Sequence, residues 1–447
     1  MGISDNKKEH YGLFTATTMI IGIVIGSGIF FKSDDVLLDT GGNVWLGVLV
    51  FCIGALSIIF GSLTITELSI RTKKNGGIVG YFEEFISTKS ASGFGWFQTF
   101  VYYPTINAVI SWVAGIYILS LFDVNATLET QVFVGFIIFT CIYTINMFSY
   151  KLGGYLQNIT TLIKLVPLLL IAGVGLFWNH PAPAIPTDIT LITKTDVGFN
   201  WLAALAPIAY SFDGWIVATS ITNEVKNPKK NMTLALIIGP IIVLMVYLLY
   251  FLGLTHMLGA PFIMSTGNAA INMVGSLLFG KYGTSLLMIF VIIAVLGVIN
   301  GISLGSIRMP QALASKNMLP NSKKIANIHP TFEISLRSGI ISYIATAIWM
   351  ILHYLTQKSG ILNGRDISEI SIVFSYSCYS ILYLKVIFMK KEKQIQGYFK
   401  GILCPLFALL GSAIILFGGI LSNPFYVICF LIFCTFICFL GYRYHPN

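Results

Sequence analysis

The sequence predicts an all-α polytopic membrane protein, and three observations support that prediction. Hydrophobic residues make up 56% of the 447 residues and charged residues only 10%, whereas soluble domains carry about 25% charged residues. Apolar stretches of roughly 20 residues, long enough to cross a bilayer, recur along the whole chain. Two of these stretches are interrupted by glycine-bearing segments, which an uninterrupted helix disfavours.

About twelve such stretches can be placed on the sequence, and the first is too long to be the core of a cleavable signal peptide. The expected spans are 13–38, 45–70, 94–122, 131–150, 155–178, 201–223, 232–258, 283–314, 338–356, 367–389, 399–421 and 424–443. Residues 72–92 and 317–336 are too polar to span, so we expect loops or short surface helices there. The proline-bearing segment 179–200 should be extended and irregular.

The whole chain, 1–447, is expected to form one integral membrane domain. The two interrupted spans break at comparable depth. This similarity predicts two inverted repeats, 13–178 and 201–389, followed by an accessory pair of helices at 399–443.

The positive charges predict the orientation. If both termini are cytoplasmic, nearly all of the 27 Lys and Arg residues fall in inside segments, as the positive-inside rule requires. The exceptions outside are Lys32, Lys194, Lys281, Lys358 and Arg365. We therefore expect a multi-pass protein of the cell membrane with both termini in the cytoplasm, and we attach no nucleic-acid meaning to the net charge of +9.

The cysteines carry no sign of a disulfide framework or a metal site. All seven fall within predicted spans, and the cluster at 429–438 has no His, Asp or Glu beside it in its span. Acid/base constellations typical of enzymes are also missing from the spans. We expect a protein that is not an enzyme and that uses no cofactor and no metal.

The first interruption places Gly26 and Gly28 on either side of Ser27 in the middle of an apolar span. Broken backbone inside a bilayer is tolerated only where protein buries it or where it lines a cavity. A helix that restarts near Ser27 offers free N–H groups to a carboxylate, and the carbonyls before the break suit an ammonium group. Helix packing is the competing interpretation, which we favour for Gly22. The expected substrate-binding residues here are Ile23, Val24, Ile25, Gly26, Ser27 and Gly28.

The second interruption, at 210–215, reads Tyr-Ser-Phe-Asp-Gly-Trp. Matching breaks in the two halves of a membrane protein are the best sequence indication of a transporter's binding site. For Asp213 we favour stabilisation of the break over direct contact with an ammonium group. One of Tyr210, Phe212 and Trp215 is expected to form an aromatic gate above the ligand, with packing as the interpretation for the others. The expected binding residues here are Tyr210, Ser211, Phe212, Asp213 and Gly214.

These motifs resemble a known family. Residues 26–30 read GSGIF, residues 212–215 read FDGW within the second break, and residues 224–228 read EVKNP. They are similar to signatures of the amino acid–polyamine–organocation superfamily and of its L-amino-acid-transporter branch, and the resemblance covers essentially the whole chain. It implies the five-plus-five inverted repeat of leucine-transporter-like proteins, with broken helices 1 and 6, and sodium-independent exchange by alternating access. Ser211-Phe212 departs from the Ala-Tyr of many members and adds a hydroxyl at or beside the site.

Lys164 is the one Lys or Arg deep inside a predicted span. Ionisable residues in the membrane are functional candidates by default, because inserting one costs about 2.5–3.5 kcal/mol. A snorkelling or structurally paired lysine is the competing interpretation. In the resembled branch, a lysine of the fifth span occupies the region that sodium fills in coupled relatives. By that analogy Lys164 binds carbonyls or hydroxyls of the first and eighth spans, with Ser303 as a candidate partner.

Several polar residues within other spans are weaker candidates, because most buried Asn and Ser in membrane helices only cross-link their neighbours. They are Asn107, Ser111, Asn300, Ser375 and Ser377.

The sequence thus predicts an amino acid transporter, most simply an exchanger of small neutral L-amino acids such as alanine, serine, threonine and cysteine. Small side chains are expected because Tyr210 and Phe212 would crowd the pocket. Two alternatives stay open, a proton-coupled symporter and an amino acid sensor that does not transport. The expected partners are free L-amino acids and the lipid bilayer, with no nucleic acid and no obligate protein partner.

Overall fold

The computed structural model describes residues 11–26, 28–72, 74, 76–124, 126–185, 189–267, 269–362, 366–422 and 424–444. These residues form helices joined by short segments, with one isolated β-bridge between Tyr11 and Val225. The first half contains α1 (Leu13–Val24), η1 (Gly28–Phe31), α2 (Ser33–Asp39), α3 (Val44–Gly54), α4 (Leu56–Ser69), α5 (Ile78–Phe85), α6 (Thr88–Phe97), η2 (Gln98–Tyr102), α7 (Tyr103–Leu121), α8 (Leu128–Phe148) and α9 (Tyr150–Leu176).

The second half begins after the irregular segment 177–199. It contains η3 (Asn200–Ala204), α10 (Leu205–Tyr210), η4 (Trp215–Glu224), α11 (Pro228–Leu258), α12 (Ala260–Thr266), α13 (Ala269–Phe279), η5 (Gly280–Tyr282), α14 (Gly283–Ala314), α15 (Ser322–Ile325), α16 (Leu336–Ser359), α17 (Ser368–Lys391), η6 (Phe399–Leu403), α18 (Cys404–Ser422) and α19 (Pro424–Tyr444).

Within the described residues, eleven helical stretches are long and apolar enough to cross a membrane. The prediction of an all-α polytopic membrane protein is therefore confirmed. The first expected span is not among the eleven, because α1 is only 12 residues long. Its shortness follows from the break at Ile25 and Gly26, which ends the helix in mid-span.

The first broken segment restarts differently from the expected helix. Gly28–Phe31 forms only one 3-10 turn, and a new helix, α2, begins at Ser33. Asp34 and Asp35 lie in the first turn of α2, where acidic side chains favour a helix start. The helix expected to restart near Ser27 is therefore a single turn in the described residues, and the free N–H groups there stay a prediction.

The second broken segment passes from α10 into a turn at 211–214 and then into η4. Gly214 has a φ of +97°, a conformation that residues with a Cβ rarely adopt. The break therefore falls where the glycine predicted it, and the segment that follows winds as a 3-10 helix.

The two broken segments lie antiparallel. The N–H of Tyr11, before α1, donates to the Glu224 carbonyl at the end of η4 (2.9 Å). At the opposite end, the N–H of Thr195 donates to the Gly41 carbonyl (3.1 Å). Such opposed directions are what an inverted repeat requires, although the boundaries 13–178, 201–389 and 399–443 stay a prediction.

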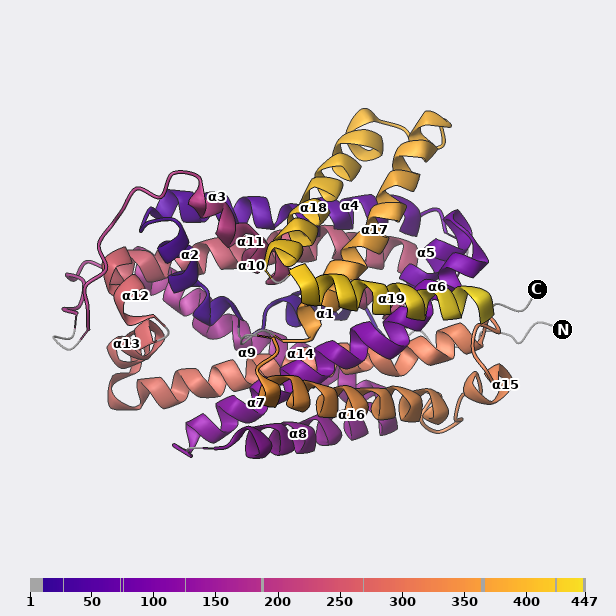
Figure 1. The fold of residues 1–447 in the computed structure, drawn as a ribbon, viewed down its shortest axis with the longest axis horizontal. Coiled ribbons are helices and arrows are strands. Elements are labelled where there is room, and N and C mark those ends of the chain that lie inside the picture. Colours follow the sequence, from indigo (N-terminus) through magenta and orange to yellow (C-terminus); the bar gives the residue numbers. More distant parts are fainter. Residues whose placement is uncertain are drawn as a thin grey trace.

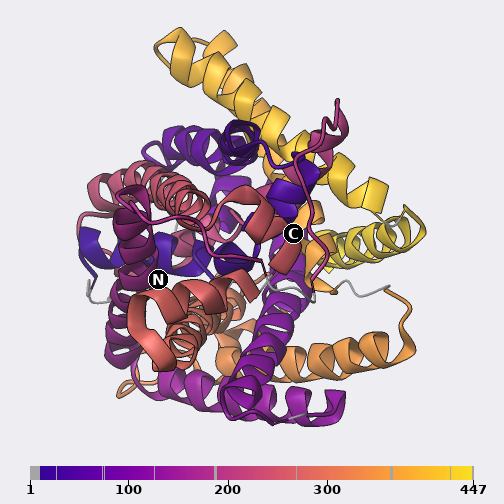
Figure 2. The ribbon, with the colours of Figure 1, turned by 90° about the vertical axis from the view of Figure 1, so that its left-hand side faces the viewer.

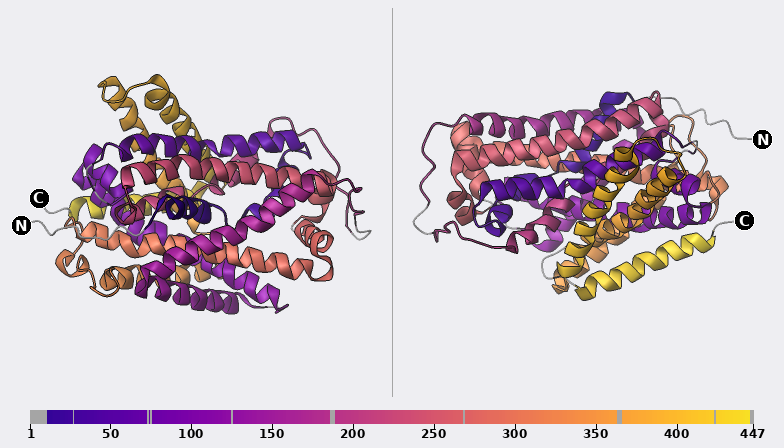
Figure 3. Two further views of the ribbon diagram at one scale, coloured as in Figure 1. Left: turned by 180° about the vertical axis from the view of Figure 1, so that it is seen from behind. Right: turned by 90° about the horizontal axis from the view of Figure 1, so that it is seen from above.

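The molecule has two recognisable ends along its long axis. The end of α19, with which the described chain terminates, lies at one end, together with α5, the start of α6 and α15, whereas α2, α12 and α13 lie at the other (Figure 1). We call these the termini side and the far side. A view from the far side shows the helices arranged around a centre (Figure 2). The short α1 lies inside, surrounded by longer helices (Figure 3), and it packs against α9, α11, α14 and η4.

One loop expectation is wrong. Residues 72–92 contain a short helix, α5, but it is not a surface helix, because Ile78–Phe82 are buried. It packs against α6, α17 and η4. Gly77, with a φ of +58°, brings the chain so close to Thr219 that a Cβ at this position would collide with the Thr219 carbonyl.

Candidate functional site

The two breaks meet at a cavity of about 1030 Å³ that extends to the far side. Residues of both breaks line it, and α7 and α14 form an apolar wall of branched side chains that includes Ile106, Val109 and Val298. The predicted residues that line the cavity are Ile23, Val24, Gly26, Gly28, Tyr210, Ser211, Asp213 and Gly214. Ser27 lies outside the described residues.

Direct packing holds the two breaks together. A Cβ built on Gly214 would lie only 2.6 Å from Cγ2 of Ile23, and one built on Gly301 would collide with the same side chain. Ile23 therefore fits between η4 and α14, with a glycine on each side. The absence of a Cβ at 214 and 301 is what lets α1 approach both helices.

Tyr247, on α11, links the carbonyls of the two breaks. Its hydroxyl lies 3.1 Å from the Val24 carbonyl oxygen and 3.1 Å from that of Ser211, so its single proton is shared between them. Sequence reasoning missed this residue. The available signal was a tyrosine in the middle of a very apolar span, where an unpaired hydroxyl is costly.

Lys164 is fully buried on α9 and reaches the end of α1. Its ammonium group donates to the carbonyls of Gly22 and Ile25 (both 2.6 Å) and of Ala294 on α14 (3.2 Å). An ammonium group has three donors and no acceptor, so three carbonyls satisfy it. These partners belong to the first and eighth expected spans, as the resemblance implies.

Ser303 is not one of these partners. Its hydroxyl is buried and has no hydrogen-bond partner among the described residues. Lys164 bonds instead to Ala294, nine positions earlier on α14, because the ammonium group contacts the far-side half of that helix.

The carbonyls at the end of α1 are therefore divided among different donors. Lys164 occupies those of Gly22 and Ile25, and Tyr247 occupies that of Val24. The Ile23 carbonyl receives no hydrogen bond from the described residues, and Ile23 lines the cavity. Of the three carbonyls expected to accept the ammonium group, that of Ile23 is the one that neither Lys164 nor Tyr247 binds.

Asp213 also lines the cavity. Its Oδ2 accepts a hydrogen bond from the Tyr102 hydroxyl (3.0 Å), whereas Oδ1 is buried and has no partner among the described residues. Tyr102 ends the π-helical turn η2, and such turns often occur at functional sites. Tyr102 and the following Tyr103 are both buried.

The three aromatic residues of the second break have different environments. Tyr210 lines the cavity. Phe212 is buried against Tyr247, with ring centroids 4.9 Å apart, and Trp215 donates from its ring nitrogen to the Tyr376 hydroxyl (3.2 Å). Of the three, Tyr210 alone is placed to act as a gate. The turn at 211–214 is not helical, which is why helical spacing does not predict where Phe212 points.

None of the weaker candidates lines the cavity. Asn300 joins α14 to α9 and α8 by donating to Gln157 (2.9 Å) and accepting from Asn146 (2.9 Å). Asn107, Ser111 and Ser375 are buried, with polar side-chain atoms that lack partners among the described residues, and Ser377 bonds to its own helix.

On the termini side, Glu224 and Arg308 form a buried ion pair between η4 and α14. The guanidinium group binds the carboxylate through two hydrogen bonds, Nε–Oε1 at 2.6 Å and Nη2–Oε2 at 2.7 Å. Both side chains are buried, with 4% of Arg308 and 9% of Glu224 exposed. The pair joins the end of η4 to α14, and the β-bridge at Tyr11 adds the start of the first broken segment.

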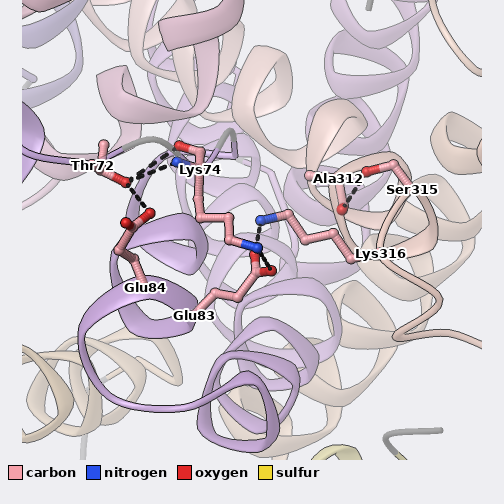
Figure 4. A network of polar contacts seen from close by, with 7 residues as sticks. All are labelled: Thr72, Lys74, Glu83, Glu84, Ala312, Ser315 and Lys316. Atoms are coloured by element: carbon pink, nitrogen blue, oxygen red, sulfur yellow. Dashed lines mark hydrogen bonds and ion pairs between the residues drawn. The ribbon is translucent and has the colours of Figure 1, made fainter. Parts of the chain in front are cut away.

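A second ion-pair cluster lies on the same side and is centred on Glu83 of α5 (Figure 4). Its carboxylate binds Lys316, which follows α14, and Lys74, at 3.0 Å. Burial would raise the pKa of Glu83, but the hydrogen bonds from the two lysines outweigh it and hold the pKa below its ordinary value of 4.5. This cluster joins α5 to the segment after α14.

The comparison with protein families decides what kind of protein this is. A family model described as amino acid permease matches residues 11–442. The chain belongs to the amino acid permease family. It is therefore a multi-pass membrane transporter and not an enzyme, and the predicted resemblance to the amino acid–polyamine–organocation superfamily is confirmed.

Curated relatives agree. The serine/threonine exchanger SteT of Bacillus subtilis (strain 168) is 29% identical over 428 residues, which cover 95% of this chain and 94% of the relative. The Asc-type amino acid transporter 1 of Homo sapiens is 27% identical, over 93% of this chain and 78% of the relative. The large neutral amino acids transporter small subunit 2 of Oryctolagus cuniculus is 26% identical, over 78% of this chain and 66% of the relative.

Proposed function

We propose that this permease exchanges small neutral L-amino acids across the cell membrane, without sodium and by alternating access. The observation that supports this most is the meeting of two antiparallel breaks at one cavity, open to the far side and closed on the termini side by ion pairs. In this proposal both termini are cytoplasmic, so the far side faces outward.

Backbone groups would recognise the two poles of the substrate. The N–H groups that start η1, at Gly28 and Ile29, have no partner within that turn and suit a carboxylate. The Ile23 carbonyl suits the ammonium group, because Lys164 and Tyr247 occupy the carbonyls on either side of it. A ligand held in this way needs no charged side chain at either pole.

The cavity wall favours a small side chain. Val298 lies close to the first break, where its Cγ2 would be 3.5 Å from a Cβ on Gly26. Ile106 and Val109 lie on the facing α7. Branched residues of this kind leave little room beside the substrate α-carbon, and Ser211 and Asp213 supply polar contacts suited to a hydroxyl. The names of the relatives, a serine/threonine exchanger and an Asc-type transporter, point in the same direction.

In this mechanism Lys164 replaces a bound sodium ion. Its three hydrogen bonds fix the end of α1 to α9 and α14 in the way that a cation shared between the helices would. Transport that needs no sodium follows from that substitution.

The test is uptake of radiolabelled L-serine and L-alanine into proteoliposomes of the purified protein, at equal pH and without sodium. Exchange predicts uptake only when the vesicles contain unlabelled amino acid. Uptake into empty vesicles would contradict exchange. Binding of L-serine without flux, measured on the same protein in detergent, would identify a sensor instead.

Proton-coupled symport is the second candidate, because two ionisable groups, Lys164 and Asp213, are buried at the breaks. An imposed pH gradient separates the two functions. Uphill uptake into empty vesicles that are alkaline inside would support symport, and no response to the gradient would support exchange.

A further inference from the structure

We propose that α18 is part of the substrate site, where it holds Tyr210 in position and forms a wall of the cavity. This inference rests on the proposed function and extends it, because sequence reasoning assigned the helix to an accessory pair outside both repeats. If it is correct, substrate affinity depends on an element that the repeat architecture leaves out.

The first observation is that one stripe of α18 lines the cavity. Ile414, Phe417 and Gly418 all contribute to it. Residues spaced by three and four positions lie on one face of a helix, so a continuous side of α18 faces the ligand space. The helix packs against α10, α4 and α17, which places it beside the second break.

The second observation is a hydrogen bond from the break to this helix. Tyr210 is the last residue of α10 before the turn at 211–214. Its hydroxyl donates to the Ile415 carbonyl of α18 (3.1 Å). That carbonyl lies in the interior of a helix, where side chains of the following turn normally cover it.

Gly419 is the reason that the carbonyl can be reached. In an α-helix each Cβ tilts toward the N-terminus, so the side chain at position i+4 lies beside the carbonyl of residue i. Gly419 occupies that position relative to Ile415. A Cβ at 419 would lie 2.7 Å from the Tyr210 hydroxyl oxygen and 2.6 Å from Cγ2 of Val373 on α17. The bare backbone at Gly419 is therefore where α10, α17 and α18 meet.

The position of Tyr210 matters because the residue after it belongs to the site. The Ser211 carbonyl lies 3.1 Å from the Tyr247 hydroxyl, which also contacts the Val24 carbonyl of the first break. Displacing the ring of Tyr210 would change both the cavity wall and this shared hydrogen bond. Tyr210 is therefore a positioning residue, and Gly419 acts through it.

The experiment is a double-mutant cycle of Tyr210→Phe, Gly419→Ala and the combined variant, measured as the Kd for L-serine in detergent and as the KM and maximal rate of exchange. Each single variant should weaken affinity several-fold, with a smaller change in maximal rate. The Kd of the double variant for L-serine should be no higher than the higher Kd of the two single variants. The reason is that removing the hydroxyl removes both the hydrogen bond and the contact that the new methyl group would crowd.

Gly173→Ala is the matched control, because a Cβ on this helical glycine meets nothing within 4 Å. Fold-changes that multiply in the double variant would show that Gly419→Ala acts through Val373 and helix packing, and would overturn the proposal. Wild-type affinity in both single variants would overturn it as well.

The two proposals fail in different ways. If the wild-type protein binds L-serine but does not exchange it, the proposed exchange function is wrong. The Kd values of the double-mutant cycle then still test the role of α18. If wild-type exchange is intact and the cycle shows no coupling, the role of α18 is wrong. If the wild-type protein binds none of alanine, serine and threonine, both are overturned.

Discussion

The two ends of the cavity use their charged residues in different ways. On the far side, Lys32 pairs with Asp35 only three residues away, and Asp366 accepts hydrogen bonds from the backbone and side chain of Ser368. On the termini side, Arg308 and Glu224 join α14 to η4. These two contacts at the mouth of the cavity each stay within one short segment, whereas the Arg308–Glu224 pair ties separate elements together; elsewhere on the far side the exposed pair of Lys358 and Glu129 also joins two helices.

We infer that this difference decides which end of the cavity resists opening. Contacts within one helix leave its distance from the opposite wall free to change. A buried ion pair between two helices fixes that distance, because removing one partner leaves an uncompensated charge and costs about 3–5 kcal/mol. In the proposed alternating-access cycle, opening of the termini side would require the Arg308–Glu224 pair and the Glu83 cluster to separate.

Substitution of Lys164 should have the largest effect on exchange, because this residue holds the first break in place and both ends of the cavity depend on that break. Lys164→Ala removes three charge-assisted hydrogen bonds, each worth about 1.5–3 kcal/mol, and frees the Gly22 and Ile25 carbonyls. We expect exchange of L-serine to fall to background while the protein still inserts in the membrane. Lys151→Ala, an exposed lysine on the same helix, is the control. Exchange at the wild-type rate by the Lys164→Ala variant would show that transport does not require Lys164.

Arg308→Ala should have the next largest effect, because it leaves Glu224 buried without its partner. A loss of about 3–5 kcal/mol corresponds to more than a hundredfold shift toward a state open on the termini side. We expect faster labelling by a membrane-impermeant thiol reagent of a cysteine that replaces Ser220, whose hydroxyl is buried on η4. The measurement uses a background in which the seven native cysteines are replaced.

Two further variants make this result interpretable. Arg71→Ala is the control, because its ion pair with Glu67 spans only four residues and stays on the termini side. It should leave the labelling rate unchanged. The double variant Arg308→Ala/Glu224→Ala removes both buried charges and should remain folded and open. Slow labelling in a well-folded double variant would show that this pair does not close the path.

Glu83→Gln should have a moderate effect. The substitution imitates a protonated carboxyl and weakens the bonds to Lys74 and Lys316, so we expect labelling at the Ser220 position to rise several-fold. The pKa of Glu83 is held below its ordinary value of 4.5. A carboxylate with a lowered pKa stabilises its ion pairs at pH values above that pKa. This stabilisation is lost as the pH falls through the pKa. Because the thiolate is the reacting species, each rate is divided by the rate of an exposed reference cysteine at the same pH. The normalised labelling at the Ser220 position, with Glu83 intact, should thus be constant from pH 5 to 8 and rise only below pH 4.5, and a rise already at pH 6 would contradict this.

The sequence was sufficient to predict the fold class and the position of both breaks, because hydropathy and glycine placement are local properties of the chain. It also indicated Lys164, since a charge in an apolar span requires partners wherever they lie. Its partners were harder to foresee. Ser303, the expected partner, lies on the correct helix but nine positions after the residue that binds Lys164. Only the packing of α9 against α14 brings the Ala294 carbonyl to the ammonium group.

The residues that sequence reasoning missed depend on distant contacts. Tyr102 and Tyr247 are ordinary aromatic residues in their own spans, and each gains its role from a partner more than thirty positions away. The same holds for α18, whose contact with Tyr210 joins residues about two hundred positions apart. Periodicity within one helix carries no information on such pairs.

Lys32→Ala should show the smallest effect and completes the contrast between the ends. Lys32 lines the mouth of the cavity, and its ion pair with Asp35 is partly exposed and lies within one short segment. Such pairs contribute about 0–1 kcal/mol, so we expect the KM for L-serine to change less than threefold. Lys316→Ala, which removes the cross-element partner of Glu83 on the termini side, is the matched lysine substitution and should raise labelling at the Ser220 position several-fold. If Lys32→Ala instead disturbs exchange more than Lys316→Ala does, the charges of the far side also act across the cavity, and the proposed difference between the two ends is wrong.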